Sequence, residues 1–155
     1  MGNKRVKIIS HRGNLSGPAS DRENSPSYII EALQHFDVEV DVWRVNNSWM
    51  LGHDSPRYEV EEDFFTPNMW LHLKNYEAVE NIAFVKKKLQ WFWHRDDEMT
   101  LTNKQNIWCY PGVYIKDSCV VECGKPFHIE QKISGVCTDY PRDWKKYYME
   151  KKRGS

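Results

Sequence analysis

Glu39 and Asp41 are the two carboxylates whose spacing most clearly suits chemistry. They belong to the segment 38–43, whose side chains alternate with period two, so a β-strand there places both carboxylates on one face and three valines on the other. Burying a carboxylate costs free energy unless the charge has a partner. A purely structural role therefore explains two carboxylates on one strand face poorly. The pattern favours a functional pair.

Further polar side chains stand at the ends of short apolar runs. His11 and Arg12 follow the run 6–10, and His53 follows the run 49–52; the same holds for His72 with Lys74, for His94 and for Asp139. If the strands are parallel, these ends meet at the carboxyl-end rim, where α/β folds build their sites. We therefore predict one site on that rim, with histidines suited to proton transfer near neutral pH.

The elements that must position these groups are mostly short strands. Ser25-Pro26 followed by apolar residues at helical spacing predicts a helix over 26–36, and a second helix is expected over 77–88. Strands are expected over 6–10, 38–43, 49–52, 70–74, 91–94, 107–110, 118–122 and 135–139. This order predicts an α/β fold with mainly parallel strands. A complete β/α barrel takes about 250 residues, so we expect a reduced TIM-type barrel with few helices.

The bulk composition indicates a single domain, 1–155, with 1–5 and 150–155 as flexible tails and the charged run 145–153 as a solvated face or tail. The formal net charge is zero, which argues against non-specific nucleic-acid binding. No segment approaches a membrane span or a signal peptide, so a cytoplasmic protein is expected. The four cysteines lack two CxxC arms and are expected to be reduced and structural. The oligomeric state stays open.

Four motifs occur in an order that resembles the glycerophosphodiester phosphodiesterase family, a branch of the phospholipase-C-like phosphodiesterases. They are Ser10-His11-Arg12-Gly13, Glu23-Asn24-Ser25, Glu39-Val40-Asp41-Val42 and Gly52-His53-Asp54. The segment 135–141 also looks like the last barrel strand of that family. Four ordered motifs are more specific than any one of them, and the chain would be a short form of the family.

The resemblance implies a metal-dependent phosphodiesterase that hydrolyses a glycerophosphodiester-like small molecule, with a cyclic phosphate as an intermediate. Its implied catalytic residues are His11 and His53 as the acid/base pair, Arg12 as the phosphate clamp and Lys74 at a phosphate oxygen. Glu39 and Asp41 would hold Mg²⁺ or Ca²⁺. Glu23 and Asn24 match a family motif except for its proline, which is Arg22 here, and would brace the first loop and the metal shell. His94 and Trp108 are pocket candidates by position alone.

One departure from the family concerns the third metal carboxylate, which the family supplies from a Glu-x-Lys on a later strand. This chain has His72-Leu73-Lys74 there. With His72 as the third ligand, the mixed nitrogen and oxygen site would suit Mn²⁺ better than Ca²⁺. Two alternatives therefore remain open: a lyase-type relative, similar to sphingomyelinase D or phosphatidylinositol phospholipase C, and a catalytically weak phosphate-binding module. The alcohols on the phosphate are not specified, and His35 and His128 are interpreted as surface or structural residues.

Overall fold

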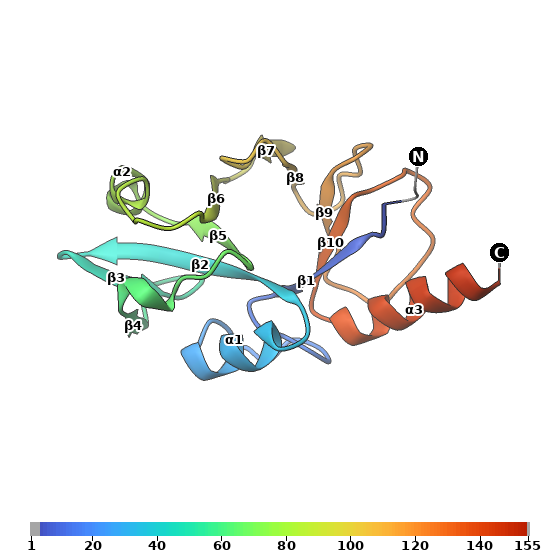
Figure 1. Cartoon of the computed structure of the whole chain (residues 1–155), viewed down its shortest axis with the longest axis horizontal. Coiled ribbons are helices and arrows are strands. Elements are labelled where there is room, and N and C mark those ends of the chain that lie inside the picture. Colours follow the sequence, from blue (N-terminus) through green and yellow to red (C-terminus); the bar gives the residue numbers. More distant parts are fainter. Residues whose placement is uncertain (1–3, 155) are drawn as a thin grey trace.

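The computed structural model describes residues 4–154, which form one curled β-sheet with helices on its outside (Figure 1). The strands are β1 (Lys7–His11), β2 (Asp37–Val45), β3 (Ser48–Leu51), β4 (Tyr58–Val60), β5 (Met69–Leu73), β6 (Gln90–Trp93), β7 (Met99–Leu101), β8 (Ile107–Cys109), β9 (Cys119–Val121) and β10 (Gly135–Thr138). The helices are α1 (Pro26–Leu33), α2 (Tyr76–Ile82), α3 (Pro141–Arg153) and the short 3₁₀ helix η1 (Glu62–Phe64).

Parallel pairs connect the central strands in the order β8, β9, β10, β1, β2, β5 and β6. The outer strands are antiparallel: β3 and β4 extend from the far half of β2, and β7 pairs with β8. The expectation of an α/β fold is confirmed, whereas a mainly parallel sheet holds only for its centre. Between residues 4 and 154, no strand pairing joins β6 to β8, so the curled sheet stays open as a half-barrel.

The two predicted helices are both shorter than expected. Pro26 stands in the first turn of α1, but the helix ends at Leu33 because Asp37 already pairs with Ile9 at the start of β2. Asn75 caps α2 by accepting a hydrogen bond from the Ala78 N–H. That helix ends at Ile82, before the run of three lysines. The short strands β4 and β7 were not predicted.

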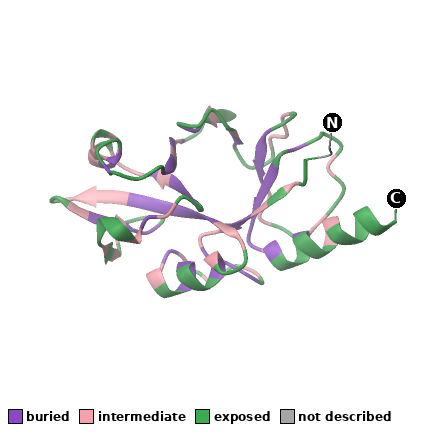
Figure 2. Cartoon of the chain, viewed as in Figure 1, coloured by how far each residue is buried: buried purple, intermediate pink, exposed green. Residues whose placement is uncertain are grey.

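The two faces of the sheet carry different layers. The valines of β2 pack outward with buried residues of α1 and α2, as their alternation predicts. Inside the curl lies a second layer that includes Ile9, Val121 and Cys137. Within that layer Trp108 stacks on Phe92, with ring centroids 4.6 Å apart, and this contact spans the unpaired side between β8 and β6. Figure 2 shows the buried central strands between more exposed helices. The inner layer forms the floor beneath the candidate site.

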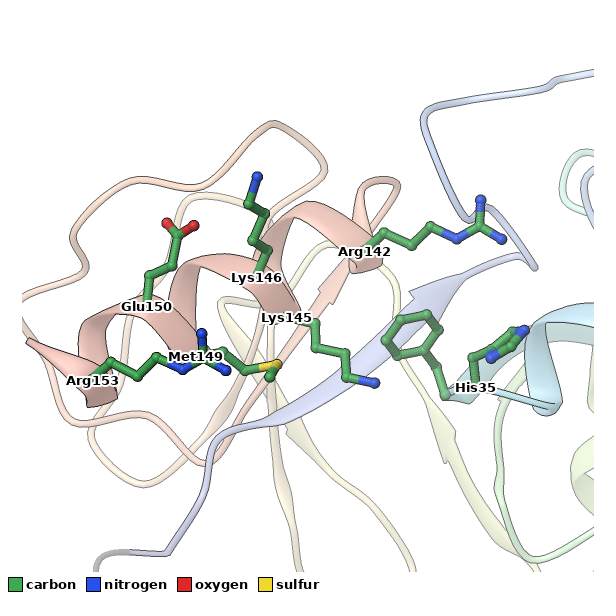
Figure 3. A pocket seen from close by; sticks show the side chains of 8 residues that line it. His35, Arg142, Lys145, Lys146, Met149, Glu150 and Arg153 are labelled. Atoms are coloured by element: carbon green, nitrogen blue, oxygen red, sulfur yellow. The ribbon is translucent and has the colours of Figure 1, made fainter.

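The C-terminal segment differs most from its prediction. Residues 150–153, expected to be part of a tail, belong to α3, whose Trp144 is fully buried against the outer face of the sheet. The cations of α3 remain exposed. A groove of about 390 Å³ beside the helix is lined by His35, Phe36 and four of these cations, Arg142, Lys145, Lys146 and Arg153 (Figure 3). None of the helices between residues 4 and 154 is long and apolar enough to cross a membrane.

Candidate active site at the strand ends

Nine of the residues predicted from the sequence line one cavity of about 530 Å³ at the carboxyl ends of the central strands. They are His11, Arg12, Glu39, Asp41, His53, His72, Lys74, His94 and Trp108. The strand register explains this convergence, because His11 lies opposite Glu39 on β1 and β2, and Asp41 lies opposite His72 on β2 and β5. Neighbours in register on parallel strands point to the same face.

Asp41 is the buried centre of this cluster. Its carboxylate accepts a hydrogen bond from the Asn24 amide at 2.9 Å and lies 3.4 Å from Arg12 Nε and 3.9 Å from Lys74 Nζ. Burial on its own would raise the pKa of Asp41, but the hydrogen bond and charge of His72, together with these two cations, hold it well below its usual range. Asp41 is therefore a carboxylate at neutral pH.

His72 presents an unprotonated nitrogen to Asp41 when its ring is neutral. Its Nε2 lies 2.8 Å from the backbone oxygen of His94, and a carbonyl only accepts, so Nε2 carries a proton and donates it. Its Nδ1 faces Asp41 Oδ1 at 3.3 Å, and a carboxylate also only accepts. Two lone pairs at this distance repel, so the arrangement calls for a cation between them, either a proton on Nδ1 or a metal ion.

Glu39 is buried beside this pair with fewer partners. Its Oε2 lies 3.5 Å from His11 Nε2, while its Oε1 is buried without a hydrogen-bond partner. Burial, and next the neighbouring charge of Asp41, raise the pKa of Glu39 to about 7. A buried carboxylate oxygen with no donor is costly, and a bound cation would remove that cost.

Glu39, Asp41 and His72 together fit a divalent metal ion. One ligand atom from each lies within 4.8 Å of the other two, so a small adjustment brings all three to coordination distance. Oε1 of Glu39 is buried without a hydrogen-bond partner, and Nδ1 of His72 faces the Asp41 carboxylate. The Nε2 proton of His72 is held by a backbone carbonyl, as is usual for a ligating histidine. The donor set is two oxygens and one nitrogen.

Asp139 holds His11 from the other side. Its Oδ1 lies 2.7 Å from His11 Nδ1 and also accepts from the Asn14 amide at 2.9 Å. Burial would lower the pKa of His11, but the hydrogen bond to Asp139, the contact with Cys123 and the charge of Glu39 raise it well above its ordinary value. The bond to Asp139 orients the ring, so its Nε2 faces Glu39.

Arg12 and the first loop are fixed by Glu23 and Asn24. Glu23 accepts hydrogen bonds from the side chains of Arg12 and Asn14 and from the Ala19 N–H. Asn24 both donates to the Asp41 carboxylate and accepts from its backbone N–H. Arg12 has a φ of 58°, a left-handed conformation that costs free energy for a residue with a side chain. This network holds that conformation and aims the guanidinium at Asp41.

His53 lies at the mouth of the cavity, 43% exposed, with Nδ1 2.7 Å from the exposed carboxylate of Asp54. Burial, and next the charge of Arg12, lower its pKa. Gly52 has a φ of 153°, and a Cβ there would lie 2.0 Å from the backbone oxygen of Ser55. The turn that presents His53 therefore needs glycine at position 52.

His94 and Trp108, which were placed in the pocket by position alone, have structural contacts there. His94 donates from Nε2 to the backbone oxygen of Asp97 at 2.6 Å, and Trp108 belongs to the aromatic floor. Sequence reasoning did not assign a site role to Asp139 or Asn14, although the position of Asp139 at a strand end was noted. Asn14 carried no signal, because it stands in an irregular loop.

Replacing Glu39 with glutamine should stabilise the metal-free protein in a pH-dependent way. The pKa of Glu39 is raised from 4.5 to about 7, so the penalty of its buried charge is absent below pH 4.5 and complete above pH 7. Urea unfolding in the presence of a chelator should show Glu39→Gln more stable by on the order of 2 kcal/mol at pH 8. The gain should nearly vanish at pH 4, where Glu39 is protonated in both states, and an equal gain at both pH values would rule out the charge as its cause.

The comparisons with known proteins found no similarity to report. No protein-family model matches the chain, and neither the curated proteins nor the solved structures include a match.

Proposed function

We propose that this chain is a metal-dependent phosphodiesterase that acts on a glycerophosphodiester-like substrate, on a shortened barrel of the TIM type. The observation that carries the proposal is the convergence of Glu39, Asp41 and His72, with ligand atoms within 4.8 Å of one another, in a cavity that Arg12 and Lys74 also line. The order of the four motifs in the sequence supports the same reaction.

Charge neutralisation is the first requirement of the reaction, because a phosphodiester is an anion. Glu39, Asp41 and His72 would hold a divalent ion, which supplies positive charge to the phosphate oxygens when it is bound. Arg12 and Lys74 add cationic donors beside the same carboxylate, Asp41. The two carboxylates suit Mg²⁺ or Ca²⁺, which select oxygen ligands. The nitrogen of His72 makes the site more favourable for Mn²⁺ than an all-oxygen site would be.

Proton transfer is the second requirement, because the reaction needs one acid and one base. The pKa values of His11 and His53 are shifted in opposite directions, as these two roles require. His11 is held by Asp139 and has a raised pKa, which suits the group that protonates the leaving oxygen from Nε2. His53 has a lowered pKa and is more exposed, which suits the group that takes the proton from the attacking hydroxyl. Two titratable groups pushed in opposite directions are a usual arrangement for acid and base catalysis.

Phosphorus NMR of a glycerophosphodiester incubated with the protein and Mg²⁺ or Mn²⁺ tests this proposal. We expect the diester signal to be replaced by a phosphomonoester signal. A cyclic phosphate that persists would instead identify the lyase-type reaction. An unchanged diester signal with every metal would instead support the second candidate, a phosphate-binding module without turnover. The observation that favours this candidate is that His72 replaces the third carboxylate of the family.

Replacing His72 with glutamate should change the metal preference. The substitution converts the third donor from nitrogen to oxygen, so harder cations gain relative to Mn²⁺. The ratio of turnover with Mg²⁺ to turnover with Mn²⁺ should rise roughly tenfold in His72→Glu. An unchanged ratio, measured on a chromogenic diester such as bis-p-nitrophenyl phosphate, would show that residue 72 is not a ligand.

A further inference from the structure

A second group of donor atoms lies next to the proposed metal ligands, on the other side of His11. Ile9, Cys137 and Val121 belong to the inner floor, and the residues two positions further along these three segments are His11, Asp139 and Cys123. His11 Nδ1 lies 2.7 Å from Asp139 Oδ1 and 3.9 Å from Cys123 Sγ. All three ligand atoms lie within 4.8 Å of one another.

We propose that His11, Cys123 and Asp139 form a separate site for a thiophilic divalent ion such as Zn²⁺, and that an ion bound there inhibits the enzyme. Sulfur, imidazole nitrogen and carboxylate oxygen are the donors that Zn²⁺ takes in proteins, whereas Mg²⁺ and Ca²⁺ select oxygen. The two sites therefore prefer different cations. The oxygen-rich site at Glu39, Asp41 and His72 suits hard cations, and the site with the Cys123 sulfur suits softer ones.

The geometry needs only small side-chain movements to close around an ion. Donor atoms about 2.0–2.3 Å from a tetrahedral ion lie about 3.3–3.7 Å apart. The nitrogen-to-oxygen distance of 2.7 Å must therefore lengthen by about 0.6 Å, and the sulfur-to-nitrogen distance of 3.9 Å must shorten slightly. Three protein donors leave a fourth position for water.

Cys123 is the thiol best placed for such a role. It is half-buried and packs at the edge of the inner floor, whereas Cys109, Cys119 and Cys137 are buried. Burial raises the pKa of Cys119 to about 12, and that of Cys137 well above its ordinary value, so neither thiol readily becomes the thiolate that a metal requires.

Inhibition follows from the atom that the ion would take, and this part of the inference rests on the proposed function. Coordination at Nδ1 replaces the proton that His11 donates to Asp139. The remaining ring proton then stays on Nε2, and because the ion occupies Nδ1 the ring cannot take up the second proton that makes it an acid near neutral pH. His11 can no longer exchange a proton with the leaving oxygen.

Cobalt absorption tests the site without any need for turnover. Co²⁺ added to the chelator-treated, reduced protein should give the near-ultraviolet charge-transfer band of a thiolate ligand. The band should be lost in Cys123→Ser and kept in the matched variant Cys119→Ala. It should also be kept in Glu39→Gln, which removes a ligand of the oxygen-rich site and none of the three donors His11, Cys123 and Asp139. Absence of the band from the wild-type protein, or its persistence in Cys123→Ser, would overturn the site.

Zinc inhibition tests the consequence. With excess Mg²⁺ present, Zn²⁺ in slight molar excess over the protein should lower diester turnover of the wild-type protein at least tenfold, and a chelator selective for Zn²⁺ should reverse it. Within Cys123→Ser, the ratio of rates with and without Zn²⁺ should return toward one. Equal inhibition of both proteins would overturn the regulatory part. A cobalt band in a protein without turnover would refute the proposed function and leave the site standing.

Discussion

Replacing His11 with alanine should lower kcat for diester turnover about 10³-fold, because acid–base catalysis by a positioned side chain contributes 10²–10⁴-fold. His11 Nε2 is the nitrogen free to serve the leaving oxygen, since Nδ1 is held by Asp139 at 2.7 Å. A steady-state assay on bis-p-nitrophenyl phosphate with saturating Mg²⁺ measures the change.

The matched control is His35→Ala, which removes a histidine that lies in the groove beside α3 rather than in the active-site cavity. Its kcat should equal that of the wild-type protein. Circular dichroism and the thermal midpoint of His11→Ala show whether the variant is folded, because it leaves Glu39 and Asp139 without the imidazole between them. A folded His11→Ala protein with a kcat within tenfold of wild type would contradict the assigned role.

Replacing Asp41 with alanine should have the largest effect on stability as well as abolishing metal-dependent turnover. The Asp41 carboxylate lies 3.4 Å from Arg12, 3.3 Å from His72 and 3.9 Å from Lys74. Removing one partner of a buried ion pair costs about 3–5 kcal/mol, because the remaining charge is left uncompensated. Urea unfolding at neutral pH measures the loss.

Two further variants separate charge from packing. Asp41→Asn retains an acceptor for the Asn24 amide, so it should lose less stability than Asp41→Ala while it still fails to hold the metal ion. Glu59→Ala removes an exposed strand carboxylate and should change stability by less than about 0.5 kcal/mol. A loss for Asp41→Ala as small as that for Glu59→Ala would show that this carboxylate does not hold the cluster together.

The sequence predicted the central strands well because their pattern depends on local alternation. The valines of β2 face outward, and Glu39 and Asp41 face the cavity, as the period of two requires. The helix α3 was not predicted, because its charged residues dominate the pattern. Its buried face consists of Pro141 and Trp144, followed one turn later by the partly buried Tyr148, a spacing that is helical but too sparse to stand out.

The site was predicted less completely than the strands. Residues at the ends of strands could be found because each strand delivers its next side chain to the same rim. The partnership of His11 with Asp139 depends on the pairing of β1 with β10, which are more than 120 residues apart in the sequence. Nothing local to Asn14 or Cys123 predicts that these side chains reach His11 and Asp139. Contacts of this kind require the register of non-adjacent strands.

The most direct test of the central claim is a titration of the metal-stripped protein with Mn²⁺ during turnover of a phosphodiester. We expect no activity without metal and a rise to full activity as one ion binds per chain. The midpoint should move to higher Mn²⁺ concentration below pH 7, because Glu39, with a pKa of about 7, must lose its proton before it can coordinate the ion. Turnover that persists without metal, or no turnover at any Mn²⁺ concentration, would contradict the account.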